Sequence, residues 1–145
     1  MITAQDQAVR VQALQTTDRN VLVEAGAGTG KTTLLVQRAL VALLDQQVPV
    51  EQLVLITFME KAAAEIIERL ETSLQAIVQQ TNGDDLRRQR AEQALKKLSA
   101  AQITTIHGFC RSILQRYAIS AQVPFNFRVL DGYQEEQLWE ETFHA

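Results

Sequence analysis

Residues 25–33, which read Ala-Gly-Ala-Gly-Thr-Gly-Lys-Thr-Thr, constrain the fold of this chain more than any other stretch. Glycines at alternate positions let the backbone curl around an anion, because they have no Cβ to clash. Successive backbone N–H groups then form a cradle for phosphate oxygens. Lys31 supplies an ammonium group for the β- and γ-phosphates, and Thr32 supplies a hydroxyl for Mg²⁺. The stretch predicts a phosphate-binding loop, in which Ala25 replaces the usual first glycine.

The residues on either side of the loop have the patterns that this motif requires. Residues 20–24, Asn-Val-Leu-Val-Glu, predict a short apolar strand that enters the loop. Residues 31–45 predict a helix that leaves it, with apolar residues at helical spacing. The positive end of this helix adds to the N–H cradle and completes an anion site. The alternative, a glycine-rich turn with a solvated lysine, does not explain the flanking strand and helix.

Length, charge and cysteine content limit the class of protein. The chain has 145 residues, the usual size of one domain, and its net charge of −3 gives no global attraction for nucleic acid. Any contact with DNA must therefore be local. Cys110 is the only cysteine, so no internal disulfide forms and a reducing compartment is expected. Because we find neither a signal-peptide pattern nor a membrane-spanning run, we expect a cytoplasmic, nucleoid-associated protein with no membrane partner.

The rest of the chain alternates between apolar runs and amphipathic stretches. The pattern predicts these elements: a helix from a capping box at Thr3 to about Leu14; strands at 53–56 and 103–106; helices over 59–80, 85–98 and 107–117; a turn at 81–84; and a last helix capped by Asp131. Strands alternating with helices indicate βαβ units and a parallel sheet, whose unbroken apolar strands suit cover on both faces. The predicted fold class is α/β, a P-loop nucleotidase core with an incomplete sheet of three strands, and we expect the N-terminal piece of a larger protein.

Two turns at the carboxyl ends of predicted strands carry residues suited to nucleic acid. In an open α/β sheet, ligands bind at these ends. After the second strand, Phe58 offers a face for base stacking, while Thr57 and Lys61 suit phosphates. After the third strand, Thr105 and His107 offer a hydroxyl and an imidazole. The alternative is structural: Phe58 and Phe109 would be core residues and His107 a cap.

Taken together, these motifs resemble the UvrD/Rep-like DNA helicases. The resemblance rests on the loop at 25–32, on Thr57-Phe58 with Lys61-Ala62-Ala63 and Glu65, and on Thr105-Ile106-His107 with Phe109, in that order. Val23-Glu24-Ala25 before the loop and Gly108, where Rep-like members usually have serine, favour the RecB/AddA-like branch. The resemblance implies that residues 1–124 are the N-terminal part of a RecA-like ATP-binding motor domain. Residues 125–145 would begin a helical inserted subdomain.

The resemblance also implies roles for individual residues. The residues that would bind ATP are Gln5, with Gln7 as an alternative, and Ala25, Gly26, Ala27, Gly28, Thr29, Gly30, Lys31, Thr32 and Thr33. Lys31 and Thr32 would act in catalysis, with Thr32 as the Mg²⁺ ligand. The residues that would touch single-stranded DNA are Thr57, Phe58, Lys61, Thr105 and His107. Met59-Glu60 departs from the common Thr-Asn at this point, and Glu60 puts a carboxylate near the phosphates.

The implied function is that of the N-terminal, ATP-binding fragment of an ATP-dependent DNA helicase or translocase in DNA repair or recombination. Its expected partners are single-stranded or partly duplex DNA, a C-terminal motor domain and a nuclease or helicase partner chain. Hydrolysis needs acidic groups on Mg²⁺ and on the attacking water. The resemblance implies that this acidic pair follows a hydrophobic strand, and neither Asp84-Asp85 nor Glu135-Glu136 stands in such a place. We therefore expect the isolated chain to be inactive.

Two other function classes share the loop. One is a P-loop kinase or small nucleotidase, for which a basic cluster could form a lid over the acceptor: Arg87, Arg88, Arg90, Lys96 and Lys97. Glu92 and an alanine stripe in the same stretch favour a solvated helix face instead. The other is a non-catalytic module that binds nucleotide or DNA.

Overall fold

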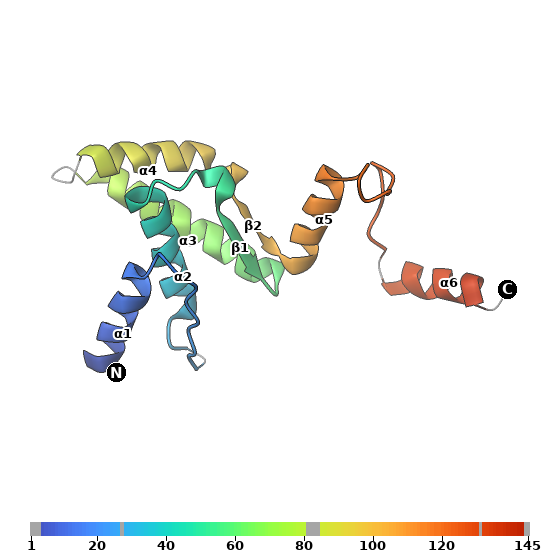
Figure 1. Ribbon diagram of the computed structural model, residues 1–145, viewed down its shortest axis with the longest axis horizontal. Coiled ribbons are helices and arrows are strands. Elements are labelled where there is room, and N and C mark those ends of the chain that lie inside the picture. Colours follow the sequence, from blue (N-terminus) through green and yellow to red (C-terminus); the bar gives the residue numbers. More distant parts are fainter. Residues whose placement is uncertain (1–3, 27, 81–84, 131, 144–145) are drawn as a thin grey trace. The chain divides into compact units, whose positions relative to one another are not determined.

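The computed structural model describes residues 4–26, 28–80, 85–130 and 132–143, with side chains from Gln7 onwards (Figure 1). The chain divides into two compact units, Met1–Phe109 and Cys110–Ala145. Within the described ranges, no helix combines the length and the apolar character needed to cross a membrane.

The first unit contains both strands and most of the helices, in the order that the sequence predicts. Its elements are α1 (Ala4–Gln15), α2 (Lys31–Leu40), β1 (Val54–Thr57), α3 (Glu60–Gln79), α4 (Asp85–Lys97) and β2 (Gln102–Thr105), and α5 (Ile106–Arg116) follows directly. Helix α2 widens into a π-helical turn over Val41–Asp45, and 3-10 turns occupy Val50–Gln52 and Leu98–Ala100. The predicted cap at Thr3, the turn at 81–84 and the cap at Asp131 lie outside the described residues.

The sheet consists of β1 and β2, which pair in parallel. The register runs from Val54 opposite Gln102 to Thr57 opposite Thr105, so both strands end at the same edge. Helix α3 packs against both strands and covers one face, where Leu55 is buried. The prediction of a parallel α/β arrangement is thus confirmed for these two strands.

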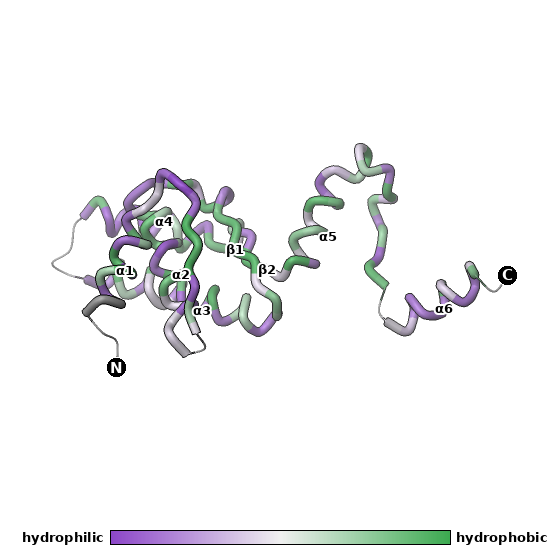
Figure 2. The backbone as a smooth tube through the Cα atoms, turned by 60° about the horizontal axis from the view of Figure 1, so that its bottom comes forward, coloured by the Kyte–Doolittle hydropathy of each residue, from purple (hydrophilic) through white to green (hydrophobic). Residues whose placement is uncertain are grey.

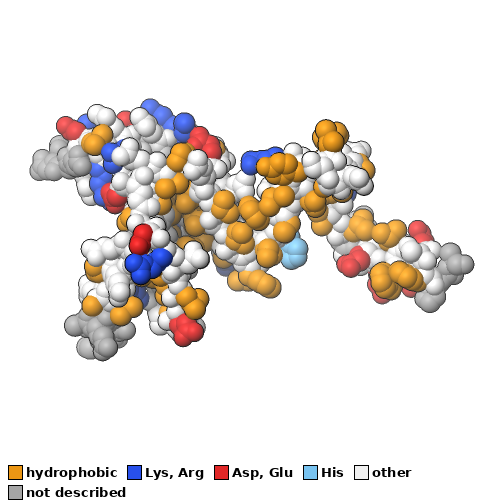
Figure 3. Space-filling model, viewed as in Figure 1, with side chains coloured by type: hydrophobic (Ala, Val, Ile, Leu, Met, Phe, Trp, Pro, Cys, Tyr) orange, Lys and Arg blue, Asp and Glu red, His pale blue; other side chains and the backbone are white. Residues whose placement is uncertain are grey.

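Two predictions about the sheet are wrong for the described residues. Residues 20–24 form no strand, and Leu22 is 87% exposed. A strand exists only through a backbone ladder with a neighbour, and this segment pairs with neither β1 nor β2, so the sheet has two strands instead of three. The second face of the sheet is also uncovered: Val54 is 42% and Ile56 45% exposed. Figure 3 shows hydrophobic side chains gathered over this region.

The core lies on the covered side of the sheet, where α2, α3 and α4 meet. Leu70 and Leu74 project from the predicted apolar stripe of α3 and are fully buried, as is Leu44 in the π-helical turn that follows α2. Buried alanines on α4, Ala91 and Ala94, let that helix lie close along α3. In Figure 2 the strand β1 appears as an apolar run beside these helices. Burial of each leucine side chain stabilises such a core by roughly 1.5–3 kcal/mol.

The second unit contains the remainder of α5, a series of turns and α6 (Gly132–Phe143). Its only described residue that is almost fully buried is Ala118, at 1% exposure. On α6, the rings of Trp139 and Phe143 stack at 4.3 Å between centroids, although both side chains remain exposed. This unit lacks a core of its own within the described residues.

Candidate functional site

The predicted phosphate loop leads directly into α2. Gly28 and Gly30 have φ angles of 75° and 83°, in the left-handed region where a side chain is strained. Gly30 is the N-cap of α2, and its carbonyl accepts the first helical hydrogen bond from the Leu34 N–H at 3.0 Å. Ala27 lies outside the described residues. The conformation explains why glycine occupies these two positions.

The side chains of the loop turn back onto its own backbone. The Lys31 ammonium donates hydrogen bonds to the carbonyls of Ala25 and Gly26, at 2.8 and 2.5 Å. The Thr29 hydroxyl donates to the Gly26 carbonyl at 2.8 Å. Thr32 is half-buried in the first turn of α2. In this structure the Lys31 ammonium donates to neutral carbonyl oxygens. The charged oxygens of a phosphate would accept stronger hydrogen bonds from it.

Arg10 brings a second cation to the loop. Its guanidinium, on α1, donates to the Thr29 carbonyl, and a Cβ added to Gly30 would stand 3.3 Å from its Nη1. Among the described side chains, no carboxylate lies within ion-pair distance of Arg10. Sequence reasoning missed this residue, because only the packing of α1 beside the loop brings it there. The site therefore presents two positive charges to an anionic ligand.

A cleft of about 1010 Å³ lies between α1, the segment at 19–26 and the loop. Val9, Ala13 and Leu34 contribute apolar surface to its lining, and the charged side chains in the lining are Arg10, Arg19, Glu24 and Lys31. Its size and mixed lining are those of a site for a small molecule. The side chain of Gln5 lies outside the described part, while the alternative Gln7 lines a separate hollow of about 700 Å³ on α1.

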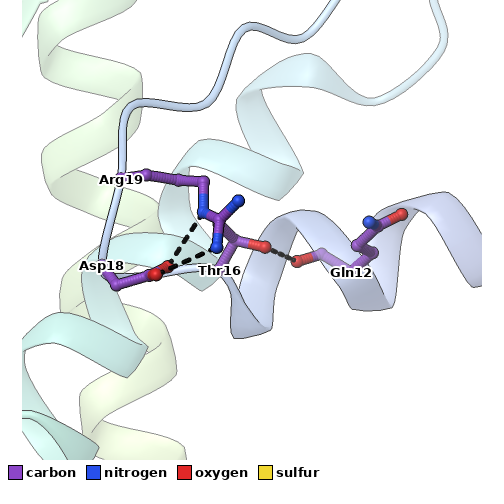
Figure 4. A network of polar contacts seen from close by, with 4 residues as sticks. All are labelled: Gln12, Thr16, Asp18 and Arg19. Carbon is purple, nitrogen blue, oxygen red and sulfur yellow. Dashed lines mark hydrogen bonds and ion pairs between the residues drawn. The ribbon is translucent and has the colours of Figure 1, made fainter.

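The end of α1 is fastened by polar contacts. Arg38, on α2, donates to the carbonyls of Ala13 and of Thr16, the latter at 3.2 Å. Figure 4 shows the neighbouring network, in which the Thr16 hydroxyl donates to the Gln12 carbonyl and Arg19 forms an ion pair with Asp18. The Arg19 guanidinium holds the pKa of the exposed Asp18 carboxyl below its usual value. The contacts of Arg38 hold the end of α1 against α2, and this places Arg10 beside the loop.

The predicted DNA-contacting residues lie together at the other edge of the unit, where β1 and β2 end. Phe58 is 91% exposed, which is inconsistent with the alternative that it belongs to the core. Lys61 and His107 are also exposed. The hydroxyls at the strand ends are engaged: Thr57 donates to the Met59 carbonyl and Thr105 to the Glu60 carboxylate, each at 2.9 Å.

None of these residues lines the cleft at the loop, which is formed entirely by residues 9–34. The structure thus separates the predicted residues into two groups within one unit. The first is a loop suited to phosphates, and the second is a strand-end surface with an aromatic ring, an ammonium group and an imidazole. An exposed aromatic side chain on the same surface as a positive charge is the combination that proteins use to bind single-stranded nucleic acid through stacking and phosphate contacts.

The basic residues of α4 are occupied in packing. Arg87 forms an ion pair with Asp45, Arg88 with Asp85 at 3.4 Å, and Lys97 with Glu51 at 3.2 Å. Arg90 donates to the Leu44 carbonyl, in the π-helical turn, at 2.7 Å. Backbone hydrogen bonding and Lys97 together keep the pKa of Glu51 below its usual value. The contacts of Arg87, Arg90 and Lys97 fasten α4 to neighbouring elements, and the Arg88 ion pair lies within α4. Together they leave little free charge for an acceptor lid.

The acidic residues considered as a catalytic pair are ion-paired or exposed where the structure describes them. Asp85 starts α4 and pairs with Arg88, whereas Glu135 and Glu136 are exposed on α6. Asp84 lies outside the described residues. Within the described ranges, no three His, Cys, Asp or Glu side chains gather as a metal-binding cluster.

The comparison with protein families decides between the classes that the loop allows. Residues 4–145 match the family described as the UvrD/REP helicase N-terminal domain. The chain belongs to this family. The match covers nearly the whole sequence, including the loop and both strand-end turns, which confirms the family resemblance read from the motifs.

Curated relatives of this UvrD/REP-family chain are named as one of the subunits of an ATP-dependent helicase/nuclease. The protein of Levilactobacillus brevis is 36% identical over 88% of the chain, and that of Desulforamulus reducens is 38% identical over 90%. The Streptococcus pneumoniae protein is 36% identical over 94%. These relatives confirm the RecB/AddA-like branch. The chain spans about a tenth of their length, 10% for the first two and 11% for the third.

Proposed function

We propose that this chain is the N-terminal, ATP-binding part of an ATP-dependent DNA helicase or translocase that acts on single-stranded DNA in repair or recombination. The observation that carries the proposal is the loop with left-handed glycines, which leads into α2 with Lys31 at its mouth, in a chain of the UvrD/REP helicase N-terminal domain family. Residues 1–124 would belong to a RecA-like motor domain, and residues 125–145 would begin an inserted helical subdomain.

The loop fits ATP with Mg²⁺. Its two left-handed glycines, the start of α2 and the cations Lys31 and Arg10 all favour a polyphosphate. In this proposal Lys31 holds the β- and γ-phosphates, Thr32 ligates Mg²⁺, and the backbone of residues 25–30 surrounds the phosphate chain. Gln5 reads the base, and Thr33 would join the ATP-binding residues, although in this structure its hydroxyl accepts a hydrogen bond of 3.3 Å from Arg69 on α3. The metal would neutralise charge on the phosphates.

The strand-end surface fits single-stranded DNA without sequence preference. Phe58 presents a ring on which any base can stack, because every base has a π-face. Lys61 and His107 would face the backbone phosphates, while Thr57 and Thr105 shape the two turns. The contact must be local because the net charge of the chain is −3.

The names of the relatives extend the proposal to partners. Each relative is named as one subunit of a helicase/nuclease. This name implies a nuclease activity and at least one further subunit. We infer that this chain works with a C-terminal motor domain, which would supply arginines to the γ-phosphate, and with such a partner chain. The assembly would work in the cytoplasm on partly duplex chromosomal DNA. The kinase alternative loses its support, because four of the five α4 cations pair internally.

The test is ATP turnover by the intact protein that contains this chain, with and without single-stranded DNA. A helicase motor hydrolyses ATP faster when DNA is bound, and Lys31→Ala should abolish the stimulated rate. A kinase would instead need a small-molecule acceptor and would not respond to DNA. Turnover that ignores DNA, or that survives Lys31→Ala, would contradict the proposal.

A further inference from the structure

Glu60 and Thr105 join the two strand-end turns. The Thr105 hydroxyl, at the end of β2, donates a hydrogen bond of 2.9 Å to Oε1 of Glu60, the first residue of α3. Thr105 is 6% exposed, the only polar residue in the described core. Because β1 and β2 end in register, this bond closes the edge of the sheet just beyond the last backbone pairing.

The same hydroxyl also holds the start of α5. It accepts a hydrogen bond from the Gly108 N–H at 3.2 Å. A Cβ at position 108 would stand 2.2 Å from the Thr104 hydroxyl and 3.4 Å from that of Thr105, so glycine is the residue that lets the helix approach. Glu60, Thr105 and Gly108 thus form one continuous chain of contacts from α3 through β2 to α5.

This geometry leaves Thr105 no proton for a phosphate. A hydroxyl has one hydrogen to donate, and that of Thr105 is directed at the Glu60 carboxylate. The exposed groups on the two turns that suit a nucleic-acid ligand are instead Phe58, Lys61 and His107, and their neighbours Met59, Glu60 and Ile106 are exposed as well. The relative placement of Phe58, Lys61 and His107 depends on how the turns are joined.

We propose that Glu60 is a positioning residue of the DNA surface, which acts through Thr105 to hold the turn after β1 and the turn after β2 as one rigid unit. The proposal rests on the proposed single-stranded DNA function. It explains why a carboxylate stands beside a surface for phosphates: the group is a hydrogen-bond acceptor for Thr105. Its position in the first turn of α3 also suits the positive helix end, which offsets part of its charge.

Two substitutions separate this role from simple charge repulsion. Glu60→Gln removes the charge but keeps an oxygen that can accept from Thr105. Glu60→Asp keeps the charge and the acid at the helix start, but its side chain is shorter by one methylene and cannot reach. In the intact protein, binding of a fluorescent oligothymidylate of about 20 nucleotides, longer than the usual site, gives the affinity. We expect Glu60→Gln to bind the oligonucleotide with the affinity of the parent protein and Glu60→Asp to bind it about five- to tenfold more weakly.

A double-mutant cycle tests whether Glu60 acts through Thr105. Thr105→Val should weaken binding at least as much as Glu60→Asp, and the second change should add nothing to the first. Thr105→Ser keeps the hydroxyl and should bind the oligonucleotide with the affinity of the parent protein. Because no phosphate contact is lost, the slope of log affinity against log salt should stay the same in Glu60→Asp. Melting curves of each variant show that it is folded.

Several outcomes would overturn the inference. If Glu60→Gln strengthened binding and Glu60→Asp left it unchanged, the carboxylate would act only by repelling phosphates. If Glu60→Asp weakened binding equally in the Thr105→Val background, the two residues would act independently. Parent protein that did not bind the oligonucleotide would refute the proposed function itself, whereas binding unaffected by any of these variants would refute this inference alone.

Discussion

Replacing Phe58 with alanine tests the DNA surface at its most exposed point. The ring is 91% exposed and follows β1 directly, so it is available for a base. Stacking of one base on an aromatic side chain contributes about 1–3 kcal/mol. Its loss should raise the Kd of the intact protein for single-stranded DNA by about 5- to 150-fold.

The same exposure predicts almost no effect on folding. With 91% of the residue already in water, only a small part of a phenylalanine surface of about 200 Å² is buried, roughly 20 Å². At about 25 cal/mol per Å², this amounts to about 0.5 kcal/mol of unfolding free energy. Leu74, which is fully buried, provides the contrast: Leu74→Ala should cost about 2–5 kcal/mol and lower the melting temperature by on the order of 10 °C.

The assay is fluorescence anisotropy with oligothymidylate and with a mixed sequence, alongside thermal melting. Both oligonucleotides should lose affinity to a similar degree, since every base has a face to stack. Phe125→Ala is the matched control, because Phe125 is 72% exposed but has no predicted contact with DNA. A strongly lowered melting temperature with unchanged DNA affinity in Phe58→Ala would show that the ring serves the fold instead.

Three further predictions concern the loop. Lys31→Ala should weaken binding of a fluorescent ATP analogue with Mg²⁺ by about 10- to 100-fold, since it removes a charged hydrogen-bond donor, and equal titration curves would show that the loop is not the site. Gly30→Ala should lower the unfolding free energy by about 1–2 kcal/mol in denaturant titrations, because φ is 83° and Arg10 is close; Gly26→Ala, which has room for a Cβ, is the control. The isolated chain should release no phosphate from ATP above the Lys31→Ala background, with or without DNA, because no acidic pair stands after its strands. DNA-stimulated release that Lys31→Ala removes would mean that we have misplaced the catalytic carboxylate.

The helices were predictable because their signals are local. The apolar stripe of α3 predicted a helix over 59–80, and the structure places it at Glu60–Gln79. The predicted helix over 31–45 is present as α2 and its π-helical turn. In each case residues a few positions apart decide the outcome, so the periodicity of the sequence contains the information.

The absence of a strand at residues 20–24 was not predictable in the same way. The composition of this segment favours extended backbone, but a strand requires a partner that local sequence does not name. Arg10 beside the loop and Glu60 beside Thr105 are likewise contacts between residues distant in the chain. Sequence motifs therefore located the loop and the turns, while the groups that hold them in place required the three-dimensional structure.

Because β1 and β2 pair in a fixed parallel register, the geometry of the DNA surface does not depend on the length of the chain that connects the two strands. Residues 58–101 connect β1 to β2. The pairing of Thr57 with Thr105 fixes the relative position of the turns that follow the two strands. A reporter peptide inserted between α3 and α4 would change the length of this connection without changing that pairing. One residue inserted within β1 would instead exchange its two faces and move Leu55 out of the core. We therefore expect the connection between α3 and α4 to accept an insertion, whereas an insertion within a strand would disrupt the core.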